Sequence, residues 1–429
     1  MADTEKKEPY FAPLGSTGLK IWGGVLSEEW LLELQGSSGR KAYREMGDND
    51  PTVGSINFAV EQMVRGAQFY IDPAGKDIGQ RKDAEFLDSC LLQGDMDTSW
   101  YDNLSEILSF LQFGYSVEEK SYKYRRGPNA AEEWEQSRFD DGAVGFKDFS
   151  IRAQDTISKW KIDDDTGQVT GLEQSPPPNY LTRRIPLDRC LHFRTQAHKG
   201  NPEGRSIYRN AYLPWYFKKH LQSFEAIGIE RNLAGMPVIY VPEKLFLDKS
   251  SAAKAQLANW KDLVCKLRRD DEDGLVMPRD PDKPKKYEVA LISSPGAVID
   301  TNPVIKRYDH DIASSLLADF IFLGSESRGS YALAKEGRTF FEKALLGYLD
   351  MICEVINVQA VPELFAFNGI ERPDLPKLTY EFPPDPRIEN VSKLLDAMAR
   401  GGAELFPDEK LENALRAMGG LPFKEHGEE

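Results

Sequence analysis

Two long helical stretches on either side of residues 236–300 constrain this chain more than any other feature of its sequence. The first runs from about residue 206 to residue 232 and is interrupted by Pro214. The second begins at Asn302-Pro303, where an N-cap residue precedes a proline at the first helical position. It ends at Gly324, so about 21 residues would span roughly 31 Å.

The second stretch carries its apolar residues on one narrow stripe, which leaves much polar surface. A helix of this kind is poorly buried in a monomer, and packing beside copies of the same chain is one way to cover it. A repeated heterologous contact closes into a ring when the rotation allows it. A monomer with two long surface helices fits the same periodicity, so both architectures stay open.

An α+β module is predicted before these helices. Residues 1–50 look irregular apart from a short helix near 28–34. Three- and four-residue spacing of apolar side chains predicts helices, and alternation predicts strands. The predicted helices lie near 56–67, 84–92 and 99–111, and the predicted strands near 113–117, 156–162, 168–172 and 190–194.

The segment 236–300 is predicted to be compact, with a strand near 237–241 and an amphipathic helix near 250–268. A glycine- and serine-rich break at 324–330 precedes another long helix near 334–357. Two short helices near 387–399 and 408–418 complete the prediction.

Charge and cysteine content narrow the functional classes. No apolar run reaches 18 residues, which argues against a membrane span, and four separated cysteines without a CxxC pair indicate free thiols in a protein made in a reducing cytosol. The formal net charge is −15. Proteins that grip nucleic acid neutralise phosphates and are usually basic, so a broad DNA-gripping surface is not expected. An acidic wall could instead let DNA slide past, and an ordinary acidic cytosolic protein fits the charge equally well.

Several blocks of the sequence resemble the portal proteins of tailed bacteriophages, in particular those of long-tailed phages and prophages. The strongest is residues 184–193 (RIPLDRCLHF), followed by residues 201–212 (NPEGRSIYRNAY). Earlier blocks are residues 27–31 (SEEWL), 43–46 (YREM), 50–53 (DPTV), 99–104 (SWYDNL) and 113–119 (FGYSVEE). The match continues through Trp215 and Lys218 and covers roughly residues 20–370.

The resemblance implies an α+β portal fold that assembles as a ring and has seven parts along the chain. These are an N-terminal wing (1–203), a first stem helix (204–235), a clip (236–301), a second stem helix (302–323), a tunnel loop (324–333), the C-terminal part of the wing (334–384) and a small helical crown (385–429).

The same resemblance implies a ring-shaped channel, expected to be a dodecamer, at one capsid vertex of a virion assembled in the bacterial cytoplasm. It would serve DNA packaging, retention and ejection. The implied partners are the terminase large subunit, a head–tail adaptor, the major capsid protein and double-stranded DNA, which passes without sequence readout. No membrane, cofactor or metal is expected. Five residues of the tunnel loop would lie near the DNA: Ser325, Glu326, Ser327, Arg328 and Ser330.

Candidate chemistry elsewhere in the sequence is weak. Cys190, His192 and His198 are close in sequence but match no common zinc spacing. Residues 163–167 look like part of a calcium loop, yet position twelve is Gln174 instead of glutamate, so a hairpin turn is predicted. The run 309–311 (Asp-His-Asp) points in several directions from its helix, which predicts a solvated or intersubunit face.

No phosphate-binding GxxxxGK[ST] loop and no GxSxG nucleophile elbow occur, so the sequence predicts a structural protein and not an enzyme. Two alternatives stay open. One is another virion connector or minor head protein, and the other is a metal-dependent hydrolase that uses the scattered acidic clusters.

Overall fold

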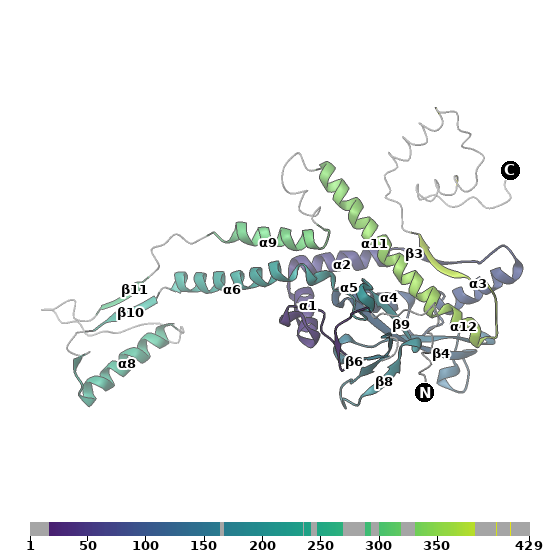
Figure 1. Ribbon diagram of the computed structural model, residues 1–429. Helices are drawn as coiled ribbons and strands as arrows, with labels where there is room; N and C mark the ends of the chain where they lie inside the picture. The colour runs from purple at the N-terminus through teal and green to yellow at the C-terminus, as the bar shows by residue number, and fades with distance from the viewer. Residues whose placement is uncertain are drawn as a thin grey trace, which may run out of the picture. The chain divides into compact units, whose positions relative to one another are not determined.

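The computed structural model describes residues 17–163, 167–234, 236–241, 247–268, 288–292, 300–318 and 331–381, together with the single residues 400 and 412. The chain divides into two compact units. Unit 1 comprises residues 1–47, 54–207 and 338–429, and unit 2 comprises residues 48–53 and 208–337. Helices and antiparallel strands both occur, which confirms the predicted mixture of helix and sheet (Figure 1).

The first sheet of unit 1 has the strand order β5–β4–β9. Its central strand β4 (Tyr115–Arg126) pairs antiparallel with β5 (Asp140–Ile151) and with β9 (Cys190–Arg194). The strand predicted near 190–194 is thereby confirmed, and the one predicted near 113–117 is confirmed from Tyr115 onward, since Phe113 still belongs to the preceding helix. Tyr115 and Val117 are buried on one face of β4, and Ser116 and Glu118 are buried on the other, so both faces of this part of the strand are covered.

The second sheet of unit 1 has the strand order β6–β7–β8. Strands β6 (Ile157–Ile162) and β7 (Val169–Gln174) form the predicted hairpin, and β8 (Arg183–Pro186) adds to β7. A hydrogen bond from the backbone N–H of Asp163 to the carbonyl of Gln168 closes the hairpin at 2.9 Å. The two sheets share one buried cluster, which contains Tyr115, Val117, Ile157, Trp160, Leu172, Ile185 and Cys190.

Helices precede the first sheet in unit 1. The helices predicted near 56–67 and 84–92 are confirmed as α2 (Pro51–Arg65) and α3 (Ile78–Leu91). The helix predicted near 99–111 divides at Leu108 into α4 (Trp100–Ile107) and α5 (Ser109–Phe113). Ser99 caps α4 by accepting the N–H of Asp102 at 3.1 Å, as a serine at this position commonly does.

The expectation of an irregular segment over residues 1–50 is wrong for α1 (Gly36–Asn49). Glycines near the start of α1 argued against a helix in the sequence, but Gly39 is required there by packing. A Cβ on Gly39 would lie 2.2 Å from the carbonyl oxygen of Leu34, so only glycine allows this close approach. The helix predicted near 28–34 is likewise reduced to the single turn η1 (Leu32–Leu34).

The C-terminal part of unit 1 returns to the N-terminal part. Helix α11 (Tyr331–Gln359) confirms the helix predicted near 334–357, and α12 (Val361–Phe367) follows it. Strand β12 (Lys377–Glu381), which the sequence did not predict, pairs antiparallel with β3 (Gln68–Asp72). In α11 the buried residues recur at three- and four-residue spacing and are Phe341, Leu345, Leu349, Ile352 and Ile356.

The stretch Phe340–Phe367 is long and apolar enough to cross a membrane by length and composition alone, with 39% of its most apolar window buried. The periodic buried face accounts for that composition, because a helix packed in a core needs apolar residues at these positions.

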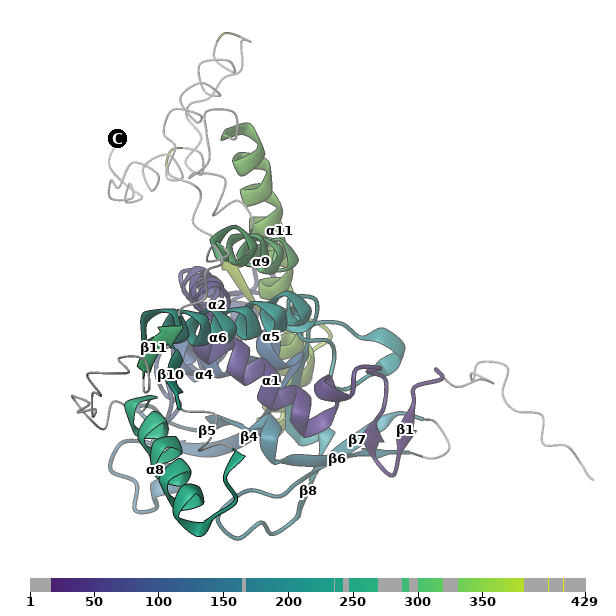
Figure 2. The ribbon, with the colours of Figure 1, turned by 90° about the vertical axis from the view of Figure 1, so that its left-hand side faces the viewer.

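Unit 2 contains the two long helices that the sequence singled out. Helix α6 (Tyr212–Ala234) packs beside α9 (Asn302–Ser315). Between them in sequence, β10 (Met236–Tyr240) pairs antiparallel with β11 (Glu288–Ile292). Helix α8 (Ser251–Arg268) confirms the amphipathic helix predicted near 250–268 and contacts β10 (Figures 1 and 2).

Two details of these helices differ from the prediction. Pro214 does not interrupt α6 but lies in its first turn, where the missing N–H needs no partner within the helix. Helix α9 ends at Ser315 instead of continuing to residue 323. Its end is a Schellman motif: the N–H of Ala318 bonds to the carbonyl of Ala313 at 2.8 Å, and Leu317 adopts φ +59°. The helices predicted near 387–399 and 408–418 lie outside the described residues, apart from positions 400 and 412.

Candidate functional site

The predicted tunnel-loop residues Ser325, Glu326, Ser327, Arg328 and Ser330 lie outside the described residues. Three features inside the described part of the chain carry the resemblance blocks or present unusual chemistry. They are a close crossing of two glycines in unit 1, a pocket in unit 1, and the helix pair α6–α9 in unit 2.

Two glycines from different resemblance blocks contact each other in unit 1. Gly114 (φ +95°) ends α5, and Gly204 (φ +57°) lies just before the boundary with unit 2. A Cβ on Gly204 would lie 2.3 Å from the carbonyl oxygen of Gly114, and a Cβ on Gly114 would lie 2.5 Å from the carbonyl oxygen of Glu203. Neither position therefore accepts a side chain, for reasons of space as well as backbone conformation.

Hydrogen bonds hold the segment around Gly204 in place. The Thr195 hydroxyl donates to the Arg205 carbonyl at 2.6 Å, and the Ser206 hydroxyl donates to the Gln112 carbonyl at 2.5 Å. Asn201 accepts the N–H of Glu203 at 2.9 Å. These bonds therefore hold residues 201–206 against the rest of unit 1, shortly before the chain enters unit 2.

Glu203 also fastens the turn to the core of unit 1. Its carboxylate accepts the indole N–H of Trp160 at 3.1 Å and lies 3.9 Å from the guanidinium of Arg40. Burial raises the pKa of Glu203, while the Trp160 hydrogen bond and Arg40 act in the opposite direction. These contacts therefore indicate a structural role for the first half of the block 201–212.

The weak metal prediction at Cys190, His192 and His198 gains no support. Within the described residues no group of three or more His, Cys, Asp and Glu side chains is arranged to hold a metal ion. The Nε2 atom of His192 lies 2.7 Å from the carbonyl of Pro202, and burial together with Arg194 lowers the pKa of His192 to about 4. The ring is thus neutral and donates this hydrogen bond, since a carbonyl can only accept. Burial raises the pKa of Cys190 to about 12, which keeps the thiol protonated.

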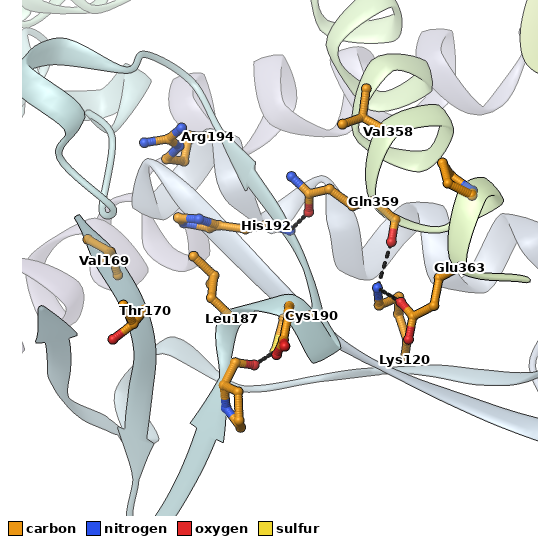
Figure 3. Close-up of a pocket in the computed structure, with 13 residues that line it drawn as sticks. Lys120, Val169, Thr170, Leu187, Cys190, His192, Arg194, Val358, Gln359 and Glu363 are labelled. Carbon is orange, nitrogen blue, oxygen red and sulfur yellow. Dashed lines mark hydrogen bonds and ion pairs between the residues drawn. The ribbon is translucent and has the colours of Figure 1, made fainter. Parts of the chain in front are cut away.

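Both residues line a pocket of about 750 Å³ in unit 1, between β9 and the junction of α11 with α12 (Figure 3). Lys120 from β4 donates to the carbonyl of Gln359 at 2.6 Å and pairs with Glu363. The side chain of Gln359 accepts the backbone N–H of His192 at 2.9 Å. The backbone N–H of His192 is therefore already hydrogen-bonded and is not free to pair with a further strand added beside β9.

Asp309, in the run 309–311, is 23% exposed and ion-paired within the chain, so it is only partly solvated, and the intersubunit alternative for this run stays a prediction. Lys218 of α6 places its Nζ atom 2.6 Å from Asp309 and 2.8 Å from Asp50, and the Thr52 hydroxyl donates to Asp309 at 2.8 Å. The side chains of Lys218 and Asp50 are 4% and 5% exposed, so this pair is buried, and Asp309 lies at the edge of the cluster. Asp50 also caps α2 by accepting the N–H of Thr52 at 2.9 Å and the N–H of Val53 at 3.1 Å. All members belong to unit 2.

The side of α6 facing away from Lys218 is apolar and exposed to solvent. Leu213, Phe217, Phe224 and Ile227 recur at three- and four-residue multiples along one side of the helix and are between 43% and 68% exposed. We call these four residues the α6 stripe. Phe217 stacks on Tyr308 of α9 at a centroid distance of 6.5 Å, yet half of its surface is still open. Exposed large apolar residues in a row mark contact surfaces more often than isolated ones do.

The sequence model of the portal protein of Mu bacteriophage matches residues 40–416. The chain belongs to this portal protein family. The recognition made from the sequence blocks is therefore confirmed over most of the chain, and the family is one of structural proteins.

Solved structures with the same fold come from gene transfer agent particles. A chain in the virion of a native gene transfer agent particle aligns with a TM-score of 0.51 at 11% identity, over 96% of this portal protein and 97% of that chain. A chain in the neck of a native particle, computed with C12 symmetry, aligns with a TM-score of 0.50 at 12% identity, over 90% of this chain and 94% of that one. At this identity the likeness establishes the fold.

Proposed function

We propose that this portal protein assembles into a closed ring of twelve copies around a channel for double-stranded DNA, at one vertex of a phage capsid. The observation that carries the proposal is the α6 stripe. Helix α9 covers part of α6 within the chain and reaches Phe217 at the edge of the stripe, yet all four large apolar residues of the stripe stay largely open to solvent. A heterologous contact that covers this stripe in every copy closes into a ring when its rotation allows.

The twelvefold symmetry of the gene transfer agent neck supports the copy number. We assign the parts of the chain accordingly. Residues 1–203 and 334–384 form the wing, 204–235 and 302–323 the stem, 236–301 the clip, 324–333 the tunnel loop and 385–429 the crown. The pairing of α6 with α9 supports the stem assignment. Within the tunnel loop, Glu326 and Arg328 are the charged residues assigned to brief contacts with phosphates.

The ring guides DNA during packaging, retention and ejection without catalysis of its own. A net charge of −15 per copy disfavours adhesion to phosphates, which lets the duplex slide. The energy for packaging comes from a separate motor. We assign the clip as the docking site for the terminase large subunit and later for the head–tail adaptor. The wing contacts the major capsid protein.

Substituting two residues of the α6 stripe by glutamate tests the ring. Phe224→Glu combined with Ile227→Glu places two charges at the proposed contact between copies. Gln222→Glu combined with Ala226→Glu adds the same charge at exposed positions of the same helix that lie outside the stripe, and is the matched control. Light scattering and negative-stain images should show annular oligomers for the unmodified chain and the control, and single chains with unchanged circular dichroism for the stripe variant.

A stripe variant that still forms rings would refute the assignment of this contact. An unmodified chain that stays a single particle at high concentration would refute the ring and favour a minor head protein instead. Hydrolysis of a phosphodiester by that single chain with added metal would favour the hydrolase alternative.

A further inference from the structure

Amide side chains from one short segment of unit 1, residues 357–368, bind the backbone of three edge strands. Asn357 and Gln359 lie in the last turn of α11, and Asn368 directly follows α12. Their partners lie on β12, β9 and β5, each of which is the outermost strand of its sheet. An edge strand presents backbone N–H and carbonyl groups that can pair with a strand of another chain, so its occupants matter for association.

Asn368 occupies the outer edge of β5 at Val144. Its Oδ1 atom accepts the backbone N–H of Val144 at 2.8 Å, and its Nδ2 atom donates to the carbonyl of Val144 at 2.9 Å. The same nitrogen donates its second hydrogen to the carbonyl of Leu364 in α12 at 2.8 Å, which orients the amide. Both hydrogens of the amide are thereby used. Val144 lies opposite Tyr124 in β4, so these bonds lie on the side of β5 that faces away from its paired strand.

Asn357 makes the same pair of bonds with the outer edge of β12. Its Oδ1 atom accepts the backbone N–H of Leu378 at 2.7 Å, and its Nδ2 atom donates to the carbonyl of Leu378 at 2.9 Å. Strand β12 pairs with β3 on its other side. Two residues opposite each other in an antiparallel ladder exchange one N–H bond in each direction. Asn357 and Asn368 therefore each take up both groups that a residue of a further strand would bond.

Gln359 occupies the outer edge of β9 with a single bond. Its Oε1 atom accepts the backbone N–H of His192 at 2.9 Å (Figure 3). The position of Gln359 is itself fixed from the sheet, because the Nζ atom of Lys120 donates to its carbonyl at 2.6 Å. Both outer strands of the sheet β5–β4–β9 are thus bound by amides of the same segment.

We propose that the amides of Asn357, Gln359 and Asn368 are edge closures that prevent strand addition between copies of this chain. Main-chain bonds to an open edge are available to any extended segment, whatever its sequence. Chains gathered at one place would offer such edges to one another. Closed edges leave association to side-chain surfaces such as the α6 stripe. The proposal concerns unit 1 alone and does not depend on the ring.

Replacing the three amide residues together by alanine tests the proposal, in a full chain that also carries Phe224→Glu and Ile227→Glu to remove the proposed ring contact. Hydrogen exchange in β5, β9 and β12 should become roughly two- to tenfold faster, the range expected for loss of one net hydrogen bond. Sedimentation velocity should show larger species as concentration rises, and infrared spectra of these species should show intermolecular antiparallel sheet. Gln112→Ala in the same background is the matched control, because the Gln112 amide donates to the carbonyl of Tyr43 in helix α1 at 3.1 Å.

Asn368→Ala alone keeps the test decisive if the triple variant does not fold, because it frees both the donor and the acceptor of Val144. Three results would overturn the proposal. Unchanged exchange would mean that the amides do not protect these edges. Faster exchange without association beyond that of the Gln112→Ala chain would mean that the amides do not prevent strand addition. Equal association of the Gln112→Ala chain would assign the effect to lost stability instead of an opened edge.

Discussion

Replacing Lys218 by methionine should destabilise unit 2 more than any surface substitution on the same two helices. The Lys218 ammonium lies 2.8 Å from Asp50 and 2.6 Å from Asp309, and its side chain is 4% exposed. Methionine fills similar space without charge, so the substitution leaves two carboxylates facing each other without a cation. Removing one partner of a buried ion pair costs about 3–5 kcal/mol.

That cost corresponds to a rise of roughly a hundredfold or more in the unfolded or locally opened population, since each 1.4 kcal/mol is a factor of about ten. Hydrogen exchange of the α6 and α9 amides reports the local part of the effect, and urea unfolding at a fixed protein concentration reports the global part. Lys306→Met on α9 makes the same change at an exposed lysine and should stay within about 0.5 kcal/mol of the unmodified chain.

A second substitution separates lost charge balance from lost packing. Adding Asp309→Asn to Lys218→Met removes one of the two stranded charges and should recover part of the loss. The reasoning is refuted if Lys218→Met costs less than about 1 kcal/mol, or if it costs no more than Lys306→Met, because a buried cation between two carboxylates cannot be dispensable.

Three further outcomes follow from the described contacts. Gly204→Ala should cost about 2–4 kcal/mol in urea unfolding, because its Cβ meets a carbonyl oxygen at 2.3 Å, whereas Gly200→Ala, also at positive φ but with open space, should cost only about 1 kcal/mol. Leu317→Gly should raise stability by roughly 1 kcal/mol in the same assay, since glycine adopts the left-handed conformation at the end of α9 without strain. A thiol reagent at pH 8 should find at least three fewer reactive groups in the native chain than in the unfolded chain, because burial raises the thiol pKa to about 11 or 12 in Cys90, Cys190 and Cys353.

Periodicity predicted the elements whose buried faces repeat over several turns. Helices α2, α3 and α11 and the hairpin of β6 with β7 all belong to this class. It failed where one close contact decides the conformation. Helix α1 begins among glycines because Gly39 has to approach the backbone of Leu34, and no spacing rule records such an approach.

The buried ion cluster was missed although the sequence contains a sign of it. Lys218 and Lys219 are adjacent, and only Lys218 lies three residues from both Trp215 and Leu221, on the side of α6 that is covered. This position on the helix favours burial of Lys218 over burial of Lys219. Its partners could not be predicted in the same way, because Asp50 and Asp309 meet it only through tertiary packing.

The α6 stripe revises the reasoning that first suggested assembly. The sequence argument assumed that a narrow apolar stripe leaves a long helix with too much polar surface. In α6 the surface left in excess is apolar instead of polar, because apolar residues occur on two sides of the helix and α9 covers one of them. A helix that is apolar on both sides needs a second partner or stays exposed to water. The bare side runs from Leu213 to Ile227, about 14 residues or roughly 21 Å, which is long enough for a neighbouring helix to lie along it. The requirement for neighbouring copies therefore rests on excess apolar surface. For this reason, charge placed at Phe224 and Ile227 should dissociate the assembly, whereas equal charge at exposed positions outside the stripe should not.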